Sequence, residues 1–280
     1  MSESYSEVVN IARDYYNSED ADNFYAIIWG GEDIHIGLYN AANESIPNAS
    51  RRTVAHMLEK VELSSQHKVL DLGSGYCGAA RYLAKSSGCQ VTALNLSEKE
   101  NQRARELNKA QGLANNIDVI DGSFENIPVS DDSFDLVWSQ DAILHSGQKE
   151  QVFREVFRVL KPGGHFLFTD PMQADDCPPG VLAPVLARIH LDSLGSFALY
   201  RKLAQQVGLI ETDIEDFTMQ LVIHYSRVKE ELKSRRDELK GKVSDDYIDR
   251  MLNGLSHWVD AGENAYLSWG VMLFEKPLAK

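Results

Sequence analysis

The sequence is poor in cysteine, in positive charge and in long apolar runs. Its three cysteines, Cys77, Cys89 and Cys177, have no zinc-site spacing, and their odd number favours a reducing compartment over a disulfide framework. No apolar run approaches the roughly 18 residues of a membrane span. The first ten residues, MSESYSEVVN, have neither a basic flank nor an apolar stretch. We therefore expect no secretory signal, no membrane contact and a cytoplasmic location.

Acidic residues outnumber basic ones by 42 to 28, which gives a formal net charge of −14. A surface that negative repels phosphate backbones, so nucleic acid is not an expected partner. The charge suits a small cationic ligand, although it also simply keeps a protein soluble. With 280 residues, 43% of them hydrophobic, the chain is long enough for one large domain or a domain plus a cap.

Short apolar runs alternate with amphipathic helical runs from residue 66 to about 170. This alternation predicts right-handed crossovers and a doubly wound, mostly parallel α/β sheet. Ser97 and Glu100 have the spacing of a capping box at a helix start, and LKPGG at 160–164 predicts a tight turn that ends a helix. The expected strands are KVLDL, QVTALN, IDVIDG, FDLVWSQ and HFLFTD, and the expected helices are GAARYLAKSS, SEKENQRARELNKAQG and KEQVFREVFRVL.

The flanks of this region differ in texture. Residues 1–65 predict an N-terminal helical cap that is rich in aromatics between 15 and 39, and 66–280 form the main domain. Within the main domain we expect an insertion around 171–196 near the substrate and a C-terminal helical insertion around 218–262. Between them, SFALYRKLAQQVG predicts a helix that closes at Gly208, followed by the strand LIETDIEDF. The final AYLSWGVMLFEKP predicts a last strand, antiparallel at or near an edge.

The strongest local signal is VLDLGSGYCG at 69–78, where an apolar strand ends in Asp71 and a helix follows Gly73, Gly75 and Gly78. Such a turn lets a ligand approach bare backbone, and by itself it fits a dinucleotide, a nucleoside or tight packing. A carboxylate at this place would repel the pyrophosphate of a dinucleotide. It favours a cationic ligand, such as S-adenosylmethionine.

Four motifs in order, VLDLGSGYCG, VTALNLS, DGSFENIPVSDDSFDLVWSQDAILHS and RVLKPGGHFLFTD, resemble those of class I S-adenosylmethionine-dependent methyltransferases. The resemblance implies a Rossmann-like seven-stranded sheet with an antiparallel last strand. It also implies S-adenosyl-L-methionine as cofactor and S-adenosyl-L-homocysteine as product. Two positions depart from the usual pattern, because Asn95 and Ser123 stand where an acid is common. The implied cofactor contacts are Asp71, Gly73, Gly75, Asn95, Leu96, Ser123, Phe124 and Gln140.

The segments YYNSEDADNFYAIIWGGEDIHIGLY and SQDAILHS further resemble the betaine-forming N-methyltransferases of the sarcosine/dimethylglycine type. Asp141 and His145 are four residues apart and would share one face of a helical turn. An ammonium has no lone pair, so a carboxylate and an imidazole beside the nitrogen suit N-methylation. The resemblance adds catalytic Tyr16 and substrate-binding Tyr25. It also places Trp29, Ile34 and His35 along the cofactor and lid.

An amino-acid substrate also needs a partner for its carboxylate, and Arg188, with His190 nearby, is the predicted clamp. The predicted function is methylation of sarcosine and dimethylglycine toward glycine betaine, without a metal, by a monomer or weak dimer. Two alternatives stay open at this point. One is an enzyme for phosphoethanolamine or another small amine, and the other is a cofactor-binding protein without catalysis.

Overall fold

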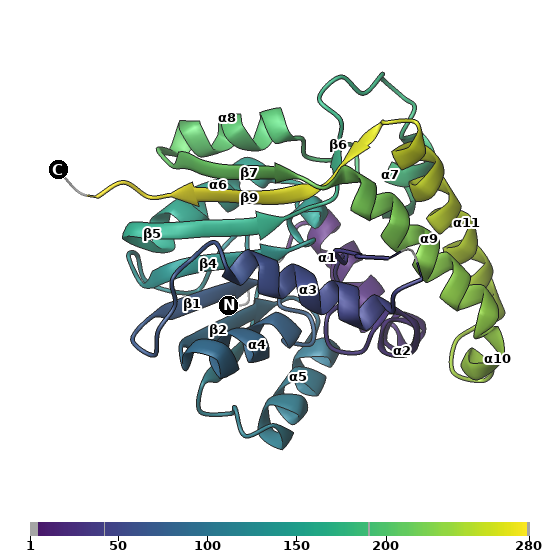
Figure 1. Ribbon diagram of the computed structural model, residues 1–280, viewed down its shortest axis with the longest axis horizontal. Coiled ribbons are helices and arrows are strands. Elements are labelled where there is room, and N and C mark those ends of the chain that lie inside the picture. Colours follow the sequence, from purple (N-terminus) through teal and green to yellow (C-terminus); the bar gives the residue numbers. More distant parts are fainter. Residues whose placement is uncertain (1–4, 42, 190, 279–280) are drawn as a thin grey trace.

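The computed structural model describes residues 5–41, 43–189 and 191–278, and its centre is a seven-stranded sheet (Figure 1). β1 to β5 run parallel, and β9 runs antiparallel to both of its neighbours. This confirms the predicted doubly wound, mostly parallel sheet, with its last strand one place in from the edge. Across the sheet, the order is β3 (Ile117–Asp121), β2 (Gln90–Asn95), β1 (Lys68–Leu72), β4 (Phe134–Gln140), β5 (Leu160–Thr169), β9 (Gly270–Glu275) and β7 (Ile210–Asp216).

The position of each strand explains its sequence pattern. β1 lies in the middle of the sheet and has helices on both faces, so its residues 69–72 are all buried and read as one apolar run broken by Asp71. β3 lies at an edge and alternates, with Ile117 and Val119 buried and Asp118 exposed. An apolar run in the sequence thus marks a central strand, whose carboxyl end lies deep in the molecule.

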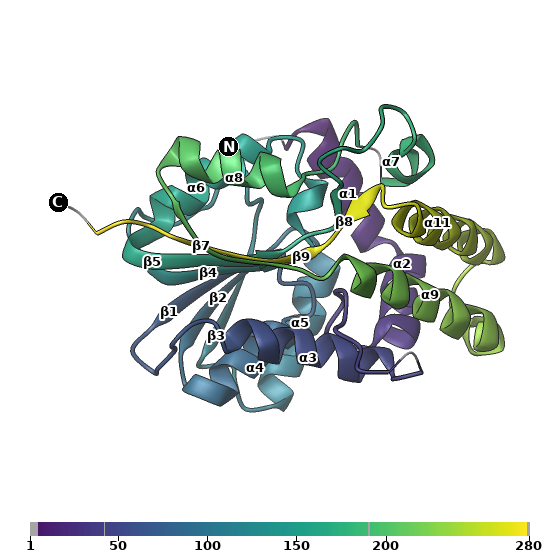
Figure 2. The ribbon, with the colours of Figure 1, turned by 45° about the horizontal axis from the view of Figure 1, so that its top comes forward.

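Helices cover both faces of the sheet (Figure 2). α6 (Lys149–Val159) and α8 (Phe197–Val207) pack on one face, where Phe153, Phe166 and Phe168 make aromatic contacts. The other face carries α3 (Ile46–Leu58), α4 (Gly78–Ser87) and α5 (Glu98–Ala110).

The cap stands beyond the carboxyl ends of the parallel strands and has a core of its own (Figure 1). That core joins Phe24 and Trp29 from the beginning of the chain to Tyr225, Leu255 and Trp258 from near its end. The segments predicted as N-terminal cap and C-terminal insertion therefore pack on each other. The cap elements are α1 (Glu7–Asn17), α2 (Glu19–Phe24), a π-helix (Tyr25–Trp29), α7 (Ala183–Ile189), α9 (Thr218–Ser234), α10 (Arg236–Leu239), α11 (Asp245–Glu263) and the paired strands β6 (Met172–Gln173) and β8 (Leu267–Ser268).

One local prediction is wrong. The LKPGG segment does not form a separate turn after α6, because Leu160 already pairs with Phe134 as the first residue of β5. Gly163 donates its N–H to the Lys276 carbonyl at 2.7 Å, and Lys276 donates back to Gly164 at 2.8 Å. Helix α6 does end just before this segment, at Val159, as predicted. Gly163 has a φ of 79°, which glycine tolerates, so the proline and glycines bend a strand where a tight turn was predicted.

Candidate active site

A cavity of about 100 Å³ lies at the carboxyl ends of β1, β2 and β4, and we call it the turn cavity. It contains the glycine turn predicted as a ligand site, together with one loop of the cap. Its lining residues are Ala12, Tyr16, Glu32, Asp33, Ile34, His35, Asp71, Gly73, Ser74, Gly75, Gly78, Ala79, Asn95, Leu96, Ser97, Glu100, Phe124, Gln140, Asp141, Ala142 and His145.

The glycines of the turn are required by its shape. Gly73 has a φ of 70°, and a Cβ there would lie 2.3 Å from Cβ of Ala142. A Cβ on Gly78, the first residue of α4, would lie 2.2 Å from the Asp33 carboxylate and from the Glu32 carbonyl. The glycines therefore let the backbone, the β4 end and the cap loop approach one another closely enough to enclose a ligand.

The turn cavity is strongly acidic. Five carboxylates line it, and no lysine or arginine is found among its described lining residues. Burial raises the pKa of Asp71 to about 7. The neighbouring His35 opposes this rise, and Asp33 adds to it. The carboxylates are Glu32, Asp33, Asp71, Glu100 and Asp141.

Several polar atoms around this cavity are buried without a partner. They include Asp71 Oδ2 and Asp33 Oδ1, which are acceptors, and Gln140 Nε2, which is a donor. His35 Nε2 also lacks a hydrogen-bond partner, and its nearest charged neighbour is Asp33 Oδ1 at 3.8 Å, beyond hydrogen-bond distance. Unsatisfied buried groups are costly, so this set indicates a ligand with a cationic end and an acceptor end. S-adenosylmethionine, with its ammonium, sulfonium and carboxylate, fits these residues, whereas a pyrophosphate does not.

Glu100 is a site residue that the sequence reasoning missed. Its backbone N–H donates to the Ser97 hydroxyl at 3.2 Å, as a capping box predicts, but its carboxylate accepts from the Asn95 side-chain amide at 2.9 Å. The side chain is buried, lines the turn cavity, and has a pKa raised by burial to about 7. A carboxylate thus stands next to Asn95 after all, and its nearness in sequence to the end of β2 was the available signal.

The remaining predicted cofactor residues extend the site along β2 and β3. Leu96 and Phe124 line the turn cavity and also a smaller adjoining hollow of about 40 Å³. Ser123 lines only the smaller hollow, where its hydroxyl accepts from the Glu125 N–H at 3.1 Å. Trp29 lines neither of these two cavities and belongs to the one described next.

A second cavity, of about 240 Å³, lies between the sheet and the cap, and we call it the cap cavity. Tyrosine, tryptophan and histidine side chains make up half of its wall, and no lysine or arginine is among the described lining residues. They are Ile11, Ala12, Tyr15, Tyr16, Tyr25, Trp29, Ile34, His35, Ile36, Asp141, Leu144, His145, Pro171, Ile189, Tyr225 and Trp258. Six of them line both cavities: Ala12, Tyr16, Ile34, His35, Asp141 and His145.

Asp141 is the half-buried carboxylate at this boundary. Its Oδ2 accepts from the Ile36 N–H at 2.6 Å, and its Oδ1 accepts from the Thr169 hydroxyl and the Trp269 indole, each at 2.8 Å. Burial raises its pKa, whereas His35 and these three neutral donors oppose the rise. The donors orient the charge without neutralising it. Trp269 lies 128 residues away and entered the site only through the pairing of β9 with β5, which no local pattern shows.

The predicted helical turn of Asp141 and His145 is replaced by another geometry. Asp141 has a φ of 51°, and only Ile143–His145 form a short 3₁₀ helix. His145 nevertheless lines both cavities, and its Nε2 lies 2.9 Å from the Tyr16 hydroxyl. Asp170, at the end of β5, accepts from the Leu144 N–H at 2.9 Å and so holds this turn.

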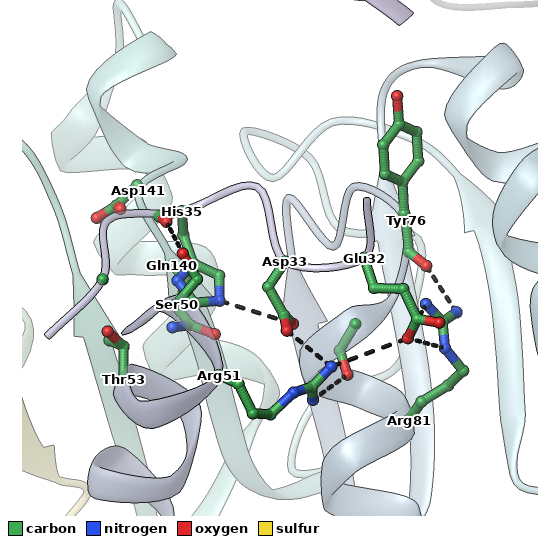
Figure 3. Close-up of polar contacts among 12 residues, drawn as sticks. Glu32, Asp33, His35, Ser50, Arg51, Thr53, Tyr76, Arg81, Gln140 and Asp141 are labelled. Carbon is green, nitrogen blue, oxygen red and sulfur yellow. Dashed lines mark hydrogen bonds and ion pairs between the residues drawn. The ribbon is translucent and has the colours of Figure 1, made fainter. Parts of the chain in front are cut away.

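The cap loop over the glycine turn is held by arginines from α3 and α4, two helices that cover one face of the sheet (Figure 3). Arg51 of α3 lies 2.7 Å from the Asp33 carboxylate and donates to the Gly78 carbonyl at 3.2 Å. Arg81 of α4 lies 3.1 Å from the Glu32 carboxylate. The loop therefore closes the turn cavity through ion pairs at its outer side.

The predicted carboxylate clamp consists of Arg188 with His190 nearby. His190 and the side chain of Arg188 lie outside the described residues, although the neighbouring Ile189 lines the cap cavity. Among the described residues no group of three or more His, Cys, Asp or Glu is arranged to hold a metal ion. In the same residues no helix has the length and apolar character needed to span a bilayer.

The fold, the acidic glycine turn and the adjoining aromatic cavity define a methyltransferase, and residues 70–168 match the family described as "Methyltransferase domain". The chain is 56% identical to the sarcosine/dimethylglycine N-methyltransferase of Halorhodospira halochloris, with 96% of this chain and 97% of that protein covered. The sarcosine/dimethylglycine N-methyltransferase of Aphanothece halophytica is 53% identical, with 96% of this chain and 98% of that protein covered. The chain belongs to the family of sarcosine/dimethylglycine N-methyltransferases.

Two solved methyltransferase structures have a similar fold. A crystal structure from Galdieria sulphuraria, proposed to be a sarcosine dimethylglycine methyltransferase, is 43% identical and superposes with a TM-score of 0.90 over 95% of this chain and all of that one. A phosphoethanolamine N-methyltransferase 2 of Haemonchus contortus has a TM-score of 0.82 at 19% identity, over 98% of this chain and 60% of that one. The second likeness shows a shared fold.

Proposed function

We propose that this chain methylates sarcosine and dimethylglycine toward glycine betaine, with S-adenosylmethionine as the methyl donor. The observation that carries the proposal is the position of Asp141. It is a half-buried carboxylate, oriented by three donors, on the boundary between an acidic cavity suited to the cofactor and an aromatic cavity suited to a small amine. Methylation places a new positive charge on nitrogen, and a fixed carboxylate stabilises that charge as it develops.

Residues of the turn cavity would hold the cofactor, which supplies an electrophilic methyl group when bound. Asp71 would accept from its ammonium, and Gln140 Nε2, which has no hydrogen-bond partner, would donate to its carboxylate. Asn95 and Glu100 would bind the ribose hydroxyls, and Leu96 with Phe124 would enclose the adenine. Gly73 and Gly75 leave room for these contacts.

The cap cavity has the character of a methylammonium site. Tyr25, Trp29 and Tyr225 line it, and an aromatic ring face attracts an alkylammonium by roughly 1–2 kcal/mol where water is excluded. Tyr16 and His145 form a hydrogen-bonded pair at the boundary. Because sarcosine and dimethylglycine are protonated at neutral pH, the imidazole would take the proton that blocks the nitrogen lone pair.

No specific observation favours phosphoethanolamine. A phosphate dianion needs several cationic donors, and the described wall of the cap cavity has neither lysine nor arginine. We keep Arg188 as the proposed partner of one substrate carboxylate. A cytoplasmic location and a monomeric or weakly dimeric state stay predictions.

The test is a labelled-methyl assay with glycine, sarcosine, dimethylglycine and phosphoethanolamine, preceded by calorimetric titration of the cofactor. We expect cofactor binding, and transfer to sarcosine and dimethylglycine well above transfer to phosphoethanolamine. Binding without transfer to any amine would contradict the enzymatic proposal, and preferential transfer to phosphoethanolamine would contradict the substrate.

A further inference from the structure

The buried segment 36–39 has no regular secondary structure, and all four of its N–H groups bond to groups outside it. The first two bonds concern the active site. The Ile36 N–H donates to Asp141 Oδ2 at 2.6 Å, and the next N–H along the chain, that of Gly37, donates to His224 Nδ1 at 3.1 Å. One peptide unit thus connects Asp141 to a histidine of α9.

The remaining bonds of the segment come from side chains of α3 and α9. The Thr53 hydroxyl of α3 accepts from the Leu38 N–H at 3.0 Å and donates to the Ile36 carbonyl at 2.9 Å. Gln220 of α9 accepts from the Tyr39 N–H at 2.7 Å. Side chains therefore satisfy a buried backbone that has no neighbouring strand to pair with.

His224 is fully buried and acts on this segment as an acceptor. A backbone N–H can only donate, so the bond from Gly37 assigns the lone pair to Nδ1 and the proton to Nε2. The Tyr39 hydroxyl bonds to the same Nδ1 at 2.9 Å, whereas Nε2 has no hydrogen-bond partner among the described residues. Burial, together with His35, lowers the pKa of His224 to about 3, so the ring stays a neutral acceptor at neutral pH.

The Ile36 N–H differs from the other two donors to Asp141 in what holds it. Thr169 is the last residue of β5, and Trp269 directly precedes β9, so the sheet fixes both of those donors. Ile36 belongs to the segment without regular structure, and its position depends on side chains such as His224.

We propose that His224 is a positioning residue, which holds the Ile36–Gly37 peptide so that the Ile36 N–H orients the Asp141 carboxylate toward the nitrogen that is methylated. The inference rests on the proposed function. His224 is not among the described lining residues of the turn cavity or the cap cavity, so it acts through Asp141 and not on a ligand.

His224→Leu and His224→Asn form the decisive pair, because the two side chains are similar in shape and only Asn carries an acceptor close to the place of Nδ1. We expect the single-turnover rate with dimethylglycine to fall about tenfold in His224→Leu and less than about threefold in His224→Asn. The cofactor Kd should stay within about twofold in both. His224→Gln carries its amide beyond that place and should lose about as much as His224→Leu, so the two amides decide the matter if the Leu variant does not fold.

A second comparison separates orientation of Asp141 from a general structural role. Asp141→Ala removes the group that His224 is proposed to orient. In that background the same His224 substitution should lower the single-turnover rate by less than about twofold, because effects that act through one shared group are not additive. A further tenfold loss in that background overturns the proposal.

Gln220→Leu is the matched control, since Gln220 lies one turn before His224 on α9 and bonds to the same segment, but at Tyr39. Its single-turnover rate should stay within about twofold of the wild type. Equal losses in Gln220→Leu and His224→Leu, or equal rates in the Leu, Gln and Asn variants of His224, overturn the positioning role. Failure of the wild-type protein to methylate any amine would instead overturn the proposed function.

Discussion

The turn cavity and the cap cavity share six residues, yet the chain builds them in different ways. Most of the turn cavity comes from residues 71–142, as successive strand ends and the turns after them. The cap cavity joins residues 11–36 to Tyr225 and Trp258, about two hundred positions away. The turn cavity is therefore formed mainly by motifs that are close together in the sequence. The cap cavity forms only after segments from near the two ends of the chain have packed together.

The two cavities also differ in the chemistry of their lining residues. The turn cavity presents five carboxylates, which suits a cationic cofactor, and the cap cavity presents aromatic faces with a single carboxylate. Asp141 serves both, because it lies where they meet. Perturbing residues of one region, of the other and of the boundary should produce separable effects on cofactor binding and on rate.

Asp141→Asn should give the largest effect and should affect rate more than binding. The neutral amide lacks the charge that stabilises the methylated nitrogen. Its NH₂ group, which is a donor, also replaces a carboxylate oxygen that accepts a hydrogen bond from a neighbouring donor. We expect kcat for dimethylglycine to fall roughly 10²- to 10³-fold at every pH from about 6 to 9, as measured with labelled cofactor.

Thr169→Val is the control for Asp141, because it removes one donor and leaves the carboxylate charged. Its kcat should fall less than about tenfold. Similar losses in the two variants would mean that the local hydrogen bonds, rather than the charge, determine the rate.

Asp71→Ala should chiefly weaken cofactor binding. Losing a charge-assisted bond to a buried carboxylate costs roughly 1.5–3 kcal/mol, or about a 10- to 150-fold increase in Kd. Asn95→Ala should weaken binding less, since Glu100 keeps a carboxylate beside the same place. Calorimetric titration of both variants measures this, and equal losses would contradict the role given to the glycine turn.

The sequence was sufficient to predict the doubly wound, mostly parallel sheet and the turn of Asp71, Gly73 and Gly75 after its first strand, because both depend on local strand–turn–helix patterns. It also placed Tyr16 and His145 in one site, through a resemblance rather than through spacing. It could not provide the partners of Asp141, since Ile36 and Trp269 reach that carboxylate only through the fold of the cap and the position of β9. The tight turn predicted at 160–164 was wrong, because the pairing of β5 with β4 overrode the local preference of its proline and glycines.

Cofactor affinity should depend on pH through Asp71. Its carboxyl has a pKa raised to about 7, so part of it is protonated at neutral pH, and a cationic ligand favours the ionised form. Binding should therefore release a proton, and affinity should rise as pH increases through 7, by at most about tenfold per unit. Titrations at pH 6, 7 and 8 in buffers of different ionisation enthalpy measure both effects. Asp71→Asn should remove most of the slope, whereas a slope retained in that variant would assign the proton to another group, with Glu100 the first to examine.

Arg51→Ala should give the smallest effect, at the place where the two regions are joined. Arg51 holds the cap loop through Asp33 and the Gly78 carbonyl, and its side chain is 33% exposed. An ion pair of that exposure stabilises by at most about 1 kcal/mol, so loop opening should become up to about fivefold more frequent. Cofactor association and dissociation, followed by stopped-flow fluorescence, should both become faster, and Kd should change less than either rate constant.

Arg52→Ala is the matched control, because this neighbour is equally exposed but bonds to Glu44 and to the Leu38 carbonyl, outside the loop that covers the glycine turn. Its rates should equal those of the wild type. Equal acceleration in the two variants would mean that α3 as a whole, rather than the Arg51 contacts, holds the loop over the turn cavity.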